Sequence, residues 1–432
     1  MAEAKPSHRR RLIEATIAVA AQYGYREASV ARVVARAGVS RATFYEHFAD
    51  REACFLAAYR EVARRILAEL RLVEDGLEAA GSPREILARL LESADRDPAA
   101  TRVALLESLA AGSSVRAEHE RLVDAVEGLV DRYLSEVAEG PQLEIPARSL
   151  LGGVGSVIAI RVFRGETGRL GELLDELDAW LSSYALPAGE RRRDGAAWEA
   201  FGAGISAPVE ERPNPLDLRM PRRAAGAPVP AAAAEQRTRL LAAVARVVRR
   251  KGYAAMTVAD VVATAGATRE AFYEHFRSKD DAFLTAQALA LQDSVSLAAS
   301  RFFGEGSWPD RVWDAALPML GYIASVPDLA ALDFVESYAA GPAAIRRSFE
   351  SRMAYTLFLE EGYRQRPEAE ALPRLGSEAI AGAILELMRR EAVRGRIERM
   401  RDLAPQATYL ALAPFLGPGE ALRRVEERMA LA

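Results

Sequence analysis

Residues 37–52 read AGVSRATFYEHFADRE, and residues 265–281 read AGATREAFYEHFRSKDD. The pentapeptide FYEHF is identical in the two stretches and recurs after 228 residues. Weaker matches continue beyond it, such as Glu107-Ser108 with Glu336-Ser337. A period this long predicts two duplicated halves and not an array of short repeats.

The repeated stretch has the local signals of a helix, a tight turn and a second short helix. Gly38 and Gly266 supply the residue that accepts a positive φ angle where a helix ends. Ser40 and Thr268 follow as hydroxyl side chains that cap the next helix. This order predicts a helix-turn-helix. In the first copy we expect helices over residues 7–23, 30–37 and 41–48.

The rest of each half also has helical periodicity, and no stretch alternates apolar and polar residues as a strand would. We therefore expect an all-α fold with very little strand. Six prolines between residues 208 and 230 interrupt this pattern and predict an extended linker. The domains we expect are two heads over residues 5–62 and 233–291, two helical bodies over residues 63–190 and 292–432, and the linker over residues 191–232.

The charge of the chain is distributed unevenly. Residues 5–60 and residues 220–290 each have a net charge of +5, although the whole chain has −4. The remainder therefore has a net charge of −14. Two basic heads on acidic bodies indicate that the chain binds a polyanion at two places.

The composition argues against several classes of protein. The single cysteine, Cys54, excludes an intramolecular disulfide framework, and four histidines leave little material for a metal site. No apolar run is long enough for a membrane span, and no catalytic or nucleotide-binding motif is present. We therefore expect a cytoplasmic protein, associated with the nucleoid when it binds DNA, that is not an enzyme and needs no cofactor or metal.

The two stretches resemble the DNA-binding signature of TetR/AcrR-type transcriptional regulators. This resemblance implies that each half has a three-helix DNA-binding head. It also implies a larger helical body that dimerises and encloses a ligand pocket. Each half has about the length of one complete member, so the chain resembles two members fused in tandem. The partners implied are a double-stranded DNA operator and a small-molecule effector that the sequence does not identify.

The candidate DNA contacts lie on and beside the second helix of each motif. Arg41 and Arg269 begin that helix, where an arginine binds either guanine in the major groove or a phosphate. Their neighbours are caps, aromatic residues and cations, to which the resemblance assigns mainly phosphate contacts. A capping or solvated role is the alternative for several of them. The full set is Ser40, Arg41, Thr43, Tyr45, His47 and Arg51 in the first copy, and Thr268, Arg269, Tyr273, His275 and Lys279 in the second.

The copies differ where bases would be contacted. Ala42 of the first copy corresponds to Glu270 of the second, and Thr43 corresponds to Ala271. A carboxylate repels phosphate but accepts a hydrogen bond from cytosine, and the Thr43 methyl group suits thymine, with Ala271 a weaker equivalent. We therefore expect two unequal half-sites in an imperfect palindrome.

Several other residues are expected to have structural roles, and for some of them a functional role is the alternative. Phe44 and Phe48 are expected in the core of the first head, as are their equivalents in the second, and Cys54 is expected to be a buried thiol. The small residues over 152–156 predict a close approach of two helices. Aromatic residues of the bodies are candidates for a ligand pocket, with ordinary core packing as the alternative: Tyr133, Phe163, Trp313 and Tyr338.

Three functional hypotheses remain at this point. The favoured one is a ligand-responsive repressor in which one chain supplies both heads as an internal pseudo-dimer. In the second, the head at residues 233–291 is degenerate and two chains pair to present two copies of the first head. The third is a ligand-binding or scaffold protein that does not bind DNA. Further self-association is compatible with each.

Overall fold

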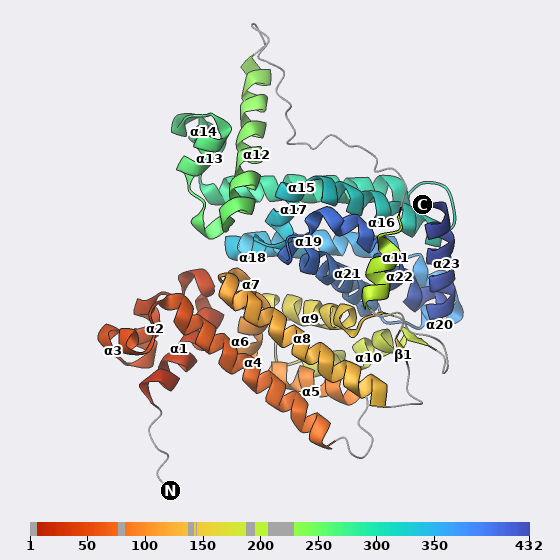
Figure 1. Ribbon diagram of the computed structural model, residues 1–432, viewed down its shortest axis with the longest axis horizontal. Coiled ribbons are helices and arrows are strands. Elements are labelled where there is room, and N and C mark those ends of the chain that lie inside the picture. Colours follow the sequence, from red (N-terminus) through yellow and green to blue (C-terminus); the bar gives the residue numbers. More distant parts are fainter. Residues whose placement is uncertain (1–6, 77–82, 137–141, 144, 187–194, 206–228) are drawn as a thin grey trace. The chain divides into compact units, whose positions relative to one another are not determined.

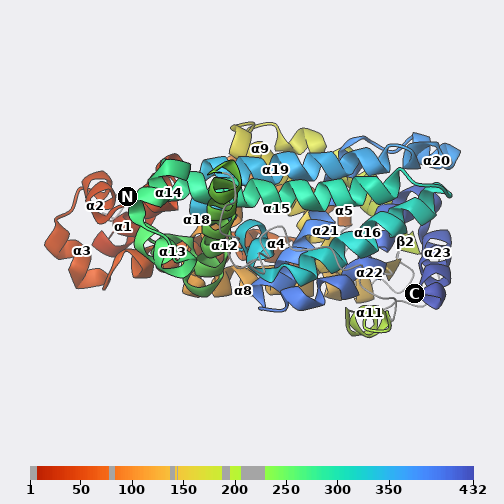
Figure 2. The same cartoon turned by 90° about the horizontal axis from the view of Figure 1, so that it is seen from above.

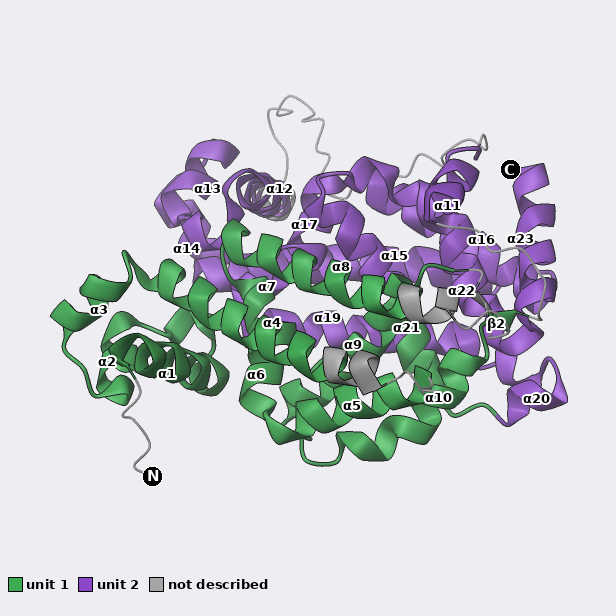
Figure 3. Ribbon diagram, turned by 60° about the horizontal axis from the view of Figure 1, so that its bottom comes forward, with its two compact units in different colours: residues 1–190, 372–383 green, residues 191–371, 384–432 purple. Residues whose placement is uncertain are grey.

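The computed structural model describes residues 7–76, 83–136, 142–143, 145–186, 195–205 and 229–432 (Figure 1). The described chain is almost entirely helical, as expected. It divides into two compact units, shown in different colours in Figure 3. Unit 1 comprises residues 1–190 and 372–383, and unit 2 comprises residues 191–371 and 384–432.

Unit 1 begins with a head of short helices and continues into a helical body. A two-stranded antiparallel sheet pairs Gln142 with Leu186. The elements are α1 (His8–Tyr23), η1 (Tyr25–Glu27), α2 (Val30–Ala37), α3 (Arg41–His47), α4 (Arg51–Gly76), α5 (Pro83–Arg96), α6 (Pro98–Arg102), the π-helix η3 (Val103–Glu107), α7 (Ser108–Ala110), α8 (Ser113–Glu136), β1 (Gln142–Leu143), α9 (Ala147–Arg164), η4 (Leu170–Leu173), α10 (Leu174–Ser182) and β2 (Ala185–Leu186).

Unit 2 also has a head followed by a helical body, with α11 before the head and α23 at the end, and α21 begins in unit 1 and continues in unit 2. Helix α15 packs between α16 and α19 (Figure 2). The elements are α11 (Gly195–Gly202), α12 (Val229–Ala255), α13 (Val258–Ala265), α14 (Arg269–His275), α15 (Lys279–Phe302), α16 (Trp308–Ser325), α17 (Pro327–Phe334), α18 (Ser337–Ala340), α19 (Pro342–Thr356), η5 (Leu357–Leu359), η6 (Gly362–Arg364), α20 (Pro367–Glu370), α21 (Leu375–Val393), η7 (Ile397–Leu403), α22 (Ala404–Leu416) and α23 (Pro418–Leu431).

The cores of the two heads are built from equivalent residues. Phe44 and Phe48 are 1% and 6% exposed, and Phe272 and Phe276 are 0% and 2% exposed. Cys54 lies in the core of the first head, 3.2 Å from the Thr16 hydroxyl, and burial raises the pKa of this thiol to about 11. The expectation of core phenylalanines and a buried thiol is confirmed.

Within unit 1, α9 lies directly against the beginning of α21. A β-carbon on Gly153 would stand 2.7 Å from the Ala379 carbonyl oxygen, and one on Gly382 would overlap the Ser156 side chain. Arg161 donates to both oxygens of Glu378, at 2.9 and 3.2 Å. The glycines therefore permit a close approach of two helices, as the small residues over 152–156 predicted.

Residues 191–232 were expected to form an extended linker, but the structure has a helix among them. Helix α11 lies inside residues 191–232, and its Trp198 is only 2% exposed because it packs on the Tyr409 ring at 5.4 Å. Gly202 lies so close to the backbone of Asp402 that a side chain would not fit. Of the six prolines, all but Pro230 lie outside the described residues, and Pro230 is in the first turn of α12.

Among the described residues, no single helix has the length and apolar character of a membrane span. The pair α16 and α17, bent by 104°, meets that criterion only when the two are taken together.

Candidate nucleic-acid interface

The turn of the first head forms as its sequence predicts. Gly38 ends α2 in the left-handed conformation, with φ of 62°. Ser40 then caps α3, because its Oγ accepts the Thr43 N–H at 3.0 Å. Arg11 closes the turn from α1 by donating to the Gly38 carbonyl at 2.8 Å. This contact joins residues 27 positions apart, so no local sequence pattern predicts it.

The second head has the same turn and a stronger cap on its preceding helix. Gly266 also has φ of 62°, and Thr268 accepts the Ala271 N–H at 3.2 Å. Thr257 and Asp260 form a reciprocal capping box at the start of α13. Lys251 lies 2.7 Å from Asp260, and together with the Thr257 hydroxyl and backbone it lowers the pKa of Asp260 to about 2.

A polar and aromatic face of each second helix points to solvent. Arg41 and Arg269 are exposed. Tyr45 and Tyr273 are 58% and 57% exposed, although each packs edge-on against the buried phenylalanine before it, at 5.3 and 5.4 Å. Each tyrosine therefore packs its ring on the core of its head and leaves more than half of its surface exposed.

The histidines of the two heads are held differently. The His47 ring is exposed and lies 6.5 Å from the His8 ring, edge to face. The equivalent His275 is half-buried, and its Nε2 lies 2.9 Å from the side-chain oxygen of Gln236, which it reaches as a donor. His275 is therefore already hydrogen-bonded within its own head.

Arg51 and Lys279 do not point outward as phosphate ligands would. The Arg51 guanidinium donates to the carbonyls of Tyr25 and Arg26, at 3.3 and 3.0 Å. The Lys279 ammonium donates to the carbonyls of Tyr253 and Met256, at 3.3 and 3.1 Å. Both cations begin a long helix and donate to backbone carbonyls of their own head, so their contacts favour an internal role over the phosphate role expected.

The positions that distinguish the heads also differ in exposure. Thr43 is half-buried with its hydroxyl 3.0 Å from the Ser40 Oγ, whereas Ala271 is only 8% exposed. The expectation that Ala271 offers a methyl group to thymine is therefore wrong, because that side chain packs into the head. Glu270 is exposed, and its own N–H together with the Thr268 hydroxyl holds the pKa of its carboxyl below the ordinary value.

The body of unit 1 contains an apolar cavity. It has about 870 Å³ of empty space, part of it open to solvent, between α5, α8, α9 and α10. Asp178 is its one charged lining residue, and Arg84 binds that carboxylate at 3.0 Å. The lining is otherwise largely aliphatic: Ile86, Leu87, Leu90, Val130, Leu150, Leu151, Val154 and Leu181, with Pro83, Ala147, Ser182 and Ala185.

The aromatic pocket candidates do not line this cavity. Phe163 is half-buried on α9 outside the lining, and the side chain of Tyr133 lies outside the described residues. In unit 2, Trp313 is 2% exposed and Tyr338 is 8% exposed, with the Tyr338 hydroxyl 3.5 Å from Arg352. The aliphatic cavity lacked a sequence signal because its residues have the same pattern as ordinary helix core.

Comparison with known proteins agrees with this geometry. The family described as bacterial regulatory proteins, tetR family, matches residues 12–58 and again residues 240–286. The chain therefore contains two TetR-type modules in tandem. Each match begins in the first helix of a head and ends beyond its helix-turn-helix.

Two curated proteins are similar to parts of this chain, a transcriptional repressor and a nucleoid occlusion factor. The HTH-type transcriptional repressor AcnR of Corynebacterium diphtheriae is 34% identical over 120 residues, which are 27% of this chain and 59% of AcnR. The match thus spans less than two thirds of that relative. The nucleoid occlusion factor SlmA of Idiomarina loihiensis is 29% identical over 140 residues, which are 32% of this chain and 68% of SlmA.

Two solved structures are also similar to parts of this chain. The fatty acid degradation regulator FadR from Bacillus halodurans is 22% identical with a TM-score of 0.36, covering 44% of this chain and 100% of FadR. A transcriptional regulator from Rhodococcus sp. Rha1 is 25% identical with a TM-score of 0.34, covering 41% of this chain and 98% of the regulator.

Proposed function

We propose that the chain is a sequence-specific DNA-binding transcriptional regulator, acting as a repressor, that presents both helix-turn-helix heads from one polypeptide. The observation that carries this proposal is the exposed face of α3 and its repeat on α14. Each has an arginine at its first residue and a solvent-directed tyrosine above a buried phenylalanine. The local net charge of +5 around each head favours a polyanion as the partner.

Each side chain of this face has a role in the proposal. Arg41 and Arg269 enter the major groove at the N-terminus of the recognition helix, where a guanidinium binds guanine O6 and N7. Tyr45, Tyr273 and His47 donate to phosphate oxygens and fix the register of the helix on the duplex. Ser40 and Thr268 act first as helix caps, and the helix N-terminus that they complete suits a phosphate.

The two heads act as an internal pseudo-dimer. In the TetR family the helices equivalent to α9 and α21 form the dimer interface. Here the close packing of Gly153 on the beginning of α21, and the Arg161–Glu378 pair, supports pairing of the two modules within one chain. Two recognition helices then bind successive major grooves roughly 34 Å apart. Because Glu270 replaces Ala42, the operator is an imperfect palindrome.

A second candidate function is favoured by specific features of the second head. His275 is engaged by Gln236, and the ionised Glu270 repels phosphate at the start of α14. If these features abolish DNA binding by that head, two chains must pair to present two first heads. Comparing the DNA affinities of Arg41→Ala and Arg269→Ala separates the candidates. A substitution in a head that does not bind DNA should leave the affinity unchanged.

The unit 1 cavity is the effector site in this proposal. Its largely aliphatic lining suits a small apolar ligand, and the Arg84–Asp178 pair offers polar contacts at its edge. Binding of the probe 1-anilinonaphthalene-8-sulfonate should fall in Leu151→Trp, which fills the cavity. The control is Leu431→Trp, on a side chain that is 82% exposed. Equal probe binding by both variants would remove the cavity from the proposal.

Selection of duplexes from a random-sequence library by the full chain tests the function directly. We expect one asymmetric, two-part site, whose affinity falls steeply with salt at a slope of roughly −0.9 per phosphate neutralised. A ligand-binding or scaffold protein without DNA binding predicts no enriched sequence and no such salt dependence.

A further inference from the structure

A buried carboxylate of each body binds the head of the same module. Glu107, 6% exposed, accepts the backbone N–H of Tyr25 at 2.7 Å. Glu336, 7% exposed, accepts the backbone N–H of Tyr253 at 2.8 Å. These are the Glu-Ser pairs that recur in the sequence, so the same bond is present in both modules.

A glycine interrupts the backbone just before each tyrosine, at the end of α1 in the first head and at a kink inside α12 in the second. Gly24 has φ of 84° and Gly252 has φ of 78°, so the chain turns sharply just before each tyrosine. A side chain at Gly252 would be strained in this conformation and would bring its β-carbon to 3.4 Å from the Glu336 carboxylate. Glycine therefore adopts this turn without strain and leaves room for the carboxylate beside it.

A backbone hydrogen bond that spans five residues lies at the carboxylate in both bodies, at the end of the π-helix η3 in the first and just beyond the end of α17 in the second. The π-helix η3 ends at Glu107, and the Ser108 N–H reaches back five residues to the Val103 carbonyl. In the second body, the Glu336 N–H reaches back five residues to the Ala331 carbonyl at 3.1 Å. A π turn inside a helix, as in η3, is rare and is frequently found at a functional site. A change from π to α spacing would rotate the carboxylate away from the head.

The carbonyl of the same tyrosine residue is bound by the helix that follows the recognition helix. The Tyr25 carbonyl accepts from Arg51 at 3.3 Å, and the Tyr253 carbonyl accepts from Lys279 at 3.3 Å. Arg51 and Lys279 are the first residues of the helices that follow the two recognition helices. One tyrosine residue therefore joins the body, through its N–H, to the end of the helix-turn-helix, through its carbonyl.

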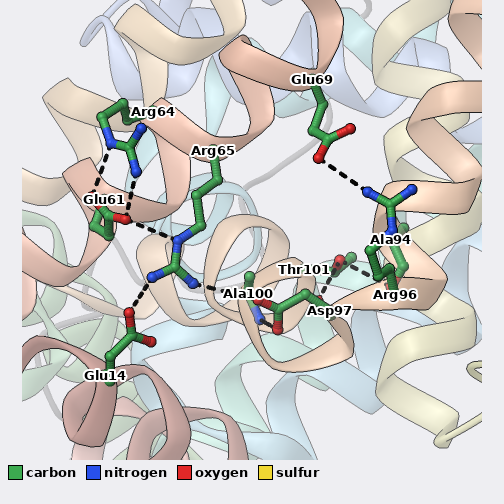
Figure 4. A network of polar contacts seen from close by, with 10 residues as sticks. All are labelled: Glu14, Glu61, Arg64, Arg65, Glu69, Ala94, Arg96, Asp97, Ala100 and Thr101. Carbon is green, nitrogen blue, oxygen red and sulfur yellow. Dashed lines mark hydrogen bonds and ion pairs between the residues drawn. The ribbon is translucent and has the colours of Figure 1, made fainter. Parts of the chain in front are cut away.

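The first module has a second connection, drawn in Figure 4. Arg65 of α4 binds Glu14 of the head and lies 3.6 Å from Asp97. Asp97 in turn caps α6 by accepting the Ala100 N–H at 3.0 Å. Helix α6 leads directly into η3 and Glu107, and α5, which lines the cavity, leads into α6.

The second module lacks that network, because Ala242 and Asp293 occupy the places of Glu14 and Arg65. There Arg249 binds Asp328 at 3.2 Å and Glu398 at 2.7 Å. The carboxylate bond to the tyrosine N–H is therefore the head–body connection that the modules share.

We propose that Glu107 and Glu336 are positioning residues that fix each recognition helix relative to its own body, and so set the half-site spacing that the chain accepts. This inference rests on the proposed function. The carboxylates are buried and bonded inside their own modules, so they act on where a helix lies and leave the groups proposed to contact DNA unchanged.

The test uses the full chain and the selected operator, with the spacer between half-sites lengthened or shortened by one base pair. We expect wild type to discriminate between spacers and Glu107→Ala to lose most of that discrimination, with the slope of affinity against salt unchanged. Glu107→Gln keeps an oxygen that accepts the Tyr25 N–H and should restore the preference. Glu336→Ala is the matched variant of the second module.

Hydrogen exchange gives a readout that does not depend on DNA. The Tyr25 amide should exchange about ten- to a hundredfold faster in Glu107→Ala, as expected for loss of a hydrogen bond to a charged group. The Tyr253 amide should be unaffected in that variant and should respond to Glu336→Ala. Should Glu107→Ala not fold, Glu107→Asp keeps the charge and withdraws the oxygen from the Tyr25 N–H.

The outcomes separate the two proposals. If wild type selects no operator, the proposed function fails. If wild type selects an operator and Glu107→Ala loses affinity equally at every spacer, or keeps the spacer preference, only the positioning role is overturned.

Discussion

The Nε2 atom of His275 lies 2.9 Å from the side-chain oxygen of Gln236, whereas the equivalent His47 faces the ring of His8 at 6.5 Å. The two heads share their helices, turns and caps, but they differ in how their histidines are engaged. We therefore expect the heads to contribute unequally to DNA binding.

Releasing His275 should strengthen the second head. Gln236→Ala removes the internal partner and leaves Nε2–H free to donate to a phosphate. Affinity for the second half-site should rise about two- to tenfold, the range for one hydrogen bond. Fluorescence anisotropy with a half-site duplex measures this. His8→Ala is the matched control in the first head, and weaker binding by Gln236→Ala would mean that Gln236 orients His275 for contact.

Removing the hydroxyl of Tyr45 should weaken binding without changing its salt dependence. Tyr45→Phe deletes one uncharged donor, so operator affinity should fall about two- to tenfold. The salt slope should be unchanged because no charge is lost. Thermal unfolding should also be unchanged, since the ring is 58% exposed. Tyr23→Phe, on an exposed tyrosine outside the recognition helix, should leave affinity unaltered.

Asp260 should make the second head sensitive to acid. Its pKa is lowered from 3.8 to about 2, so its ionised form stabilises the fold above the ordinary pKa. That stabilisation is lost as the pH falls from about 4 to 2. Asp260→Asn should lower the unfolding temperature at pH 7, and the difference from wild type should disappear near pH 2. A difference independent of pH would contradict the ion pair with Lys251.

Cys54 should report the opening of the first head. It is the single cysteine of the chain, it is 1% exposed, and burial raises its pKa to about 11. A thiol reagent at pH 8 should therefore react slowly with the native chain and at once with the denatured chain. Rapid reaction of the native protein would show that the head core opens readily.

Local signals in the sequence predicted most of each head. Ser40 and Thr268 cap their helices as expected, and Gly38 and Gly266 take the positive φ angles required of them. These features depend on residues within a few positions of one another. The phenylalanine core followed from helical spacing for the same reason.

Contacts between distant segments had no comparable signal. Glu107 binds Tyr25, which lies 82 positions away in the sequence. The repeat of the Glu-Ser pair does not predict which residue the glutamate binds. Arg51 was expected to bind phosphate, but its position beneath the Tyr25 carbonyl depends on how two helices meet. Helix α11 was not predicted because the prolines that follow it indicate a linker. Trp198, a large apolar side chain that is buried, was the signal that could have indicated it.

The number of chains on one operator tests the central claim most directly. Sedimentation of the full chain with a short operator duplex measures it, and Arg41→Ala and Arg269→Ala show which heads take part. The proposed function predicts one chain per operator and weaker binding by both variants. Two chains per operator, with Arg269→Ala binding as wild type does, would contradict it.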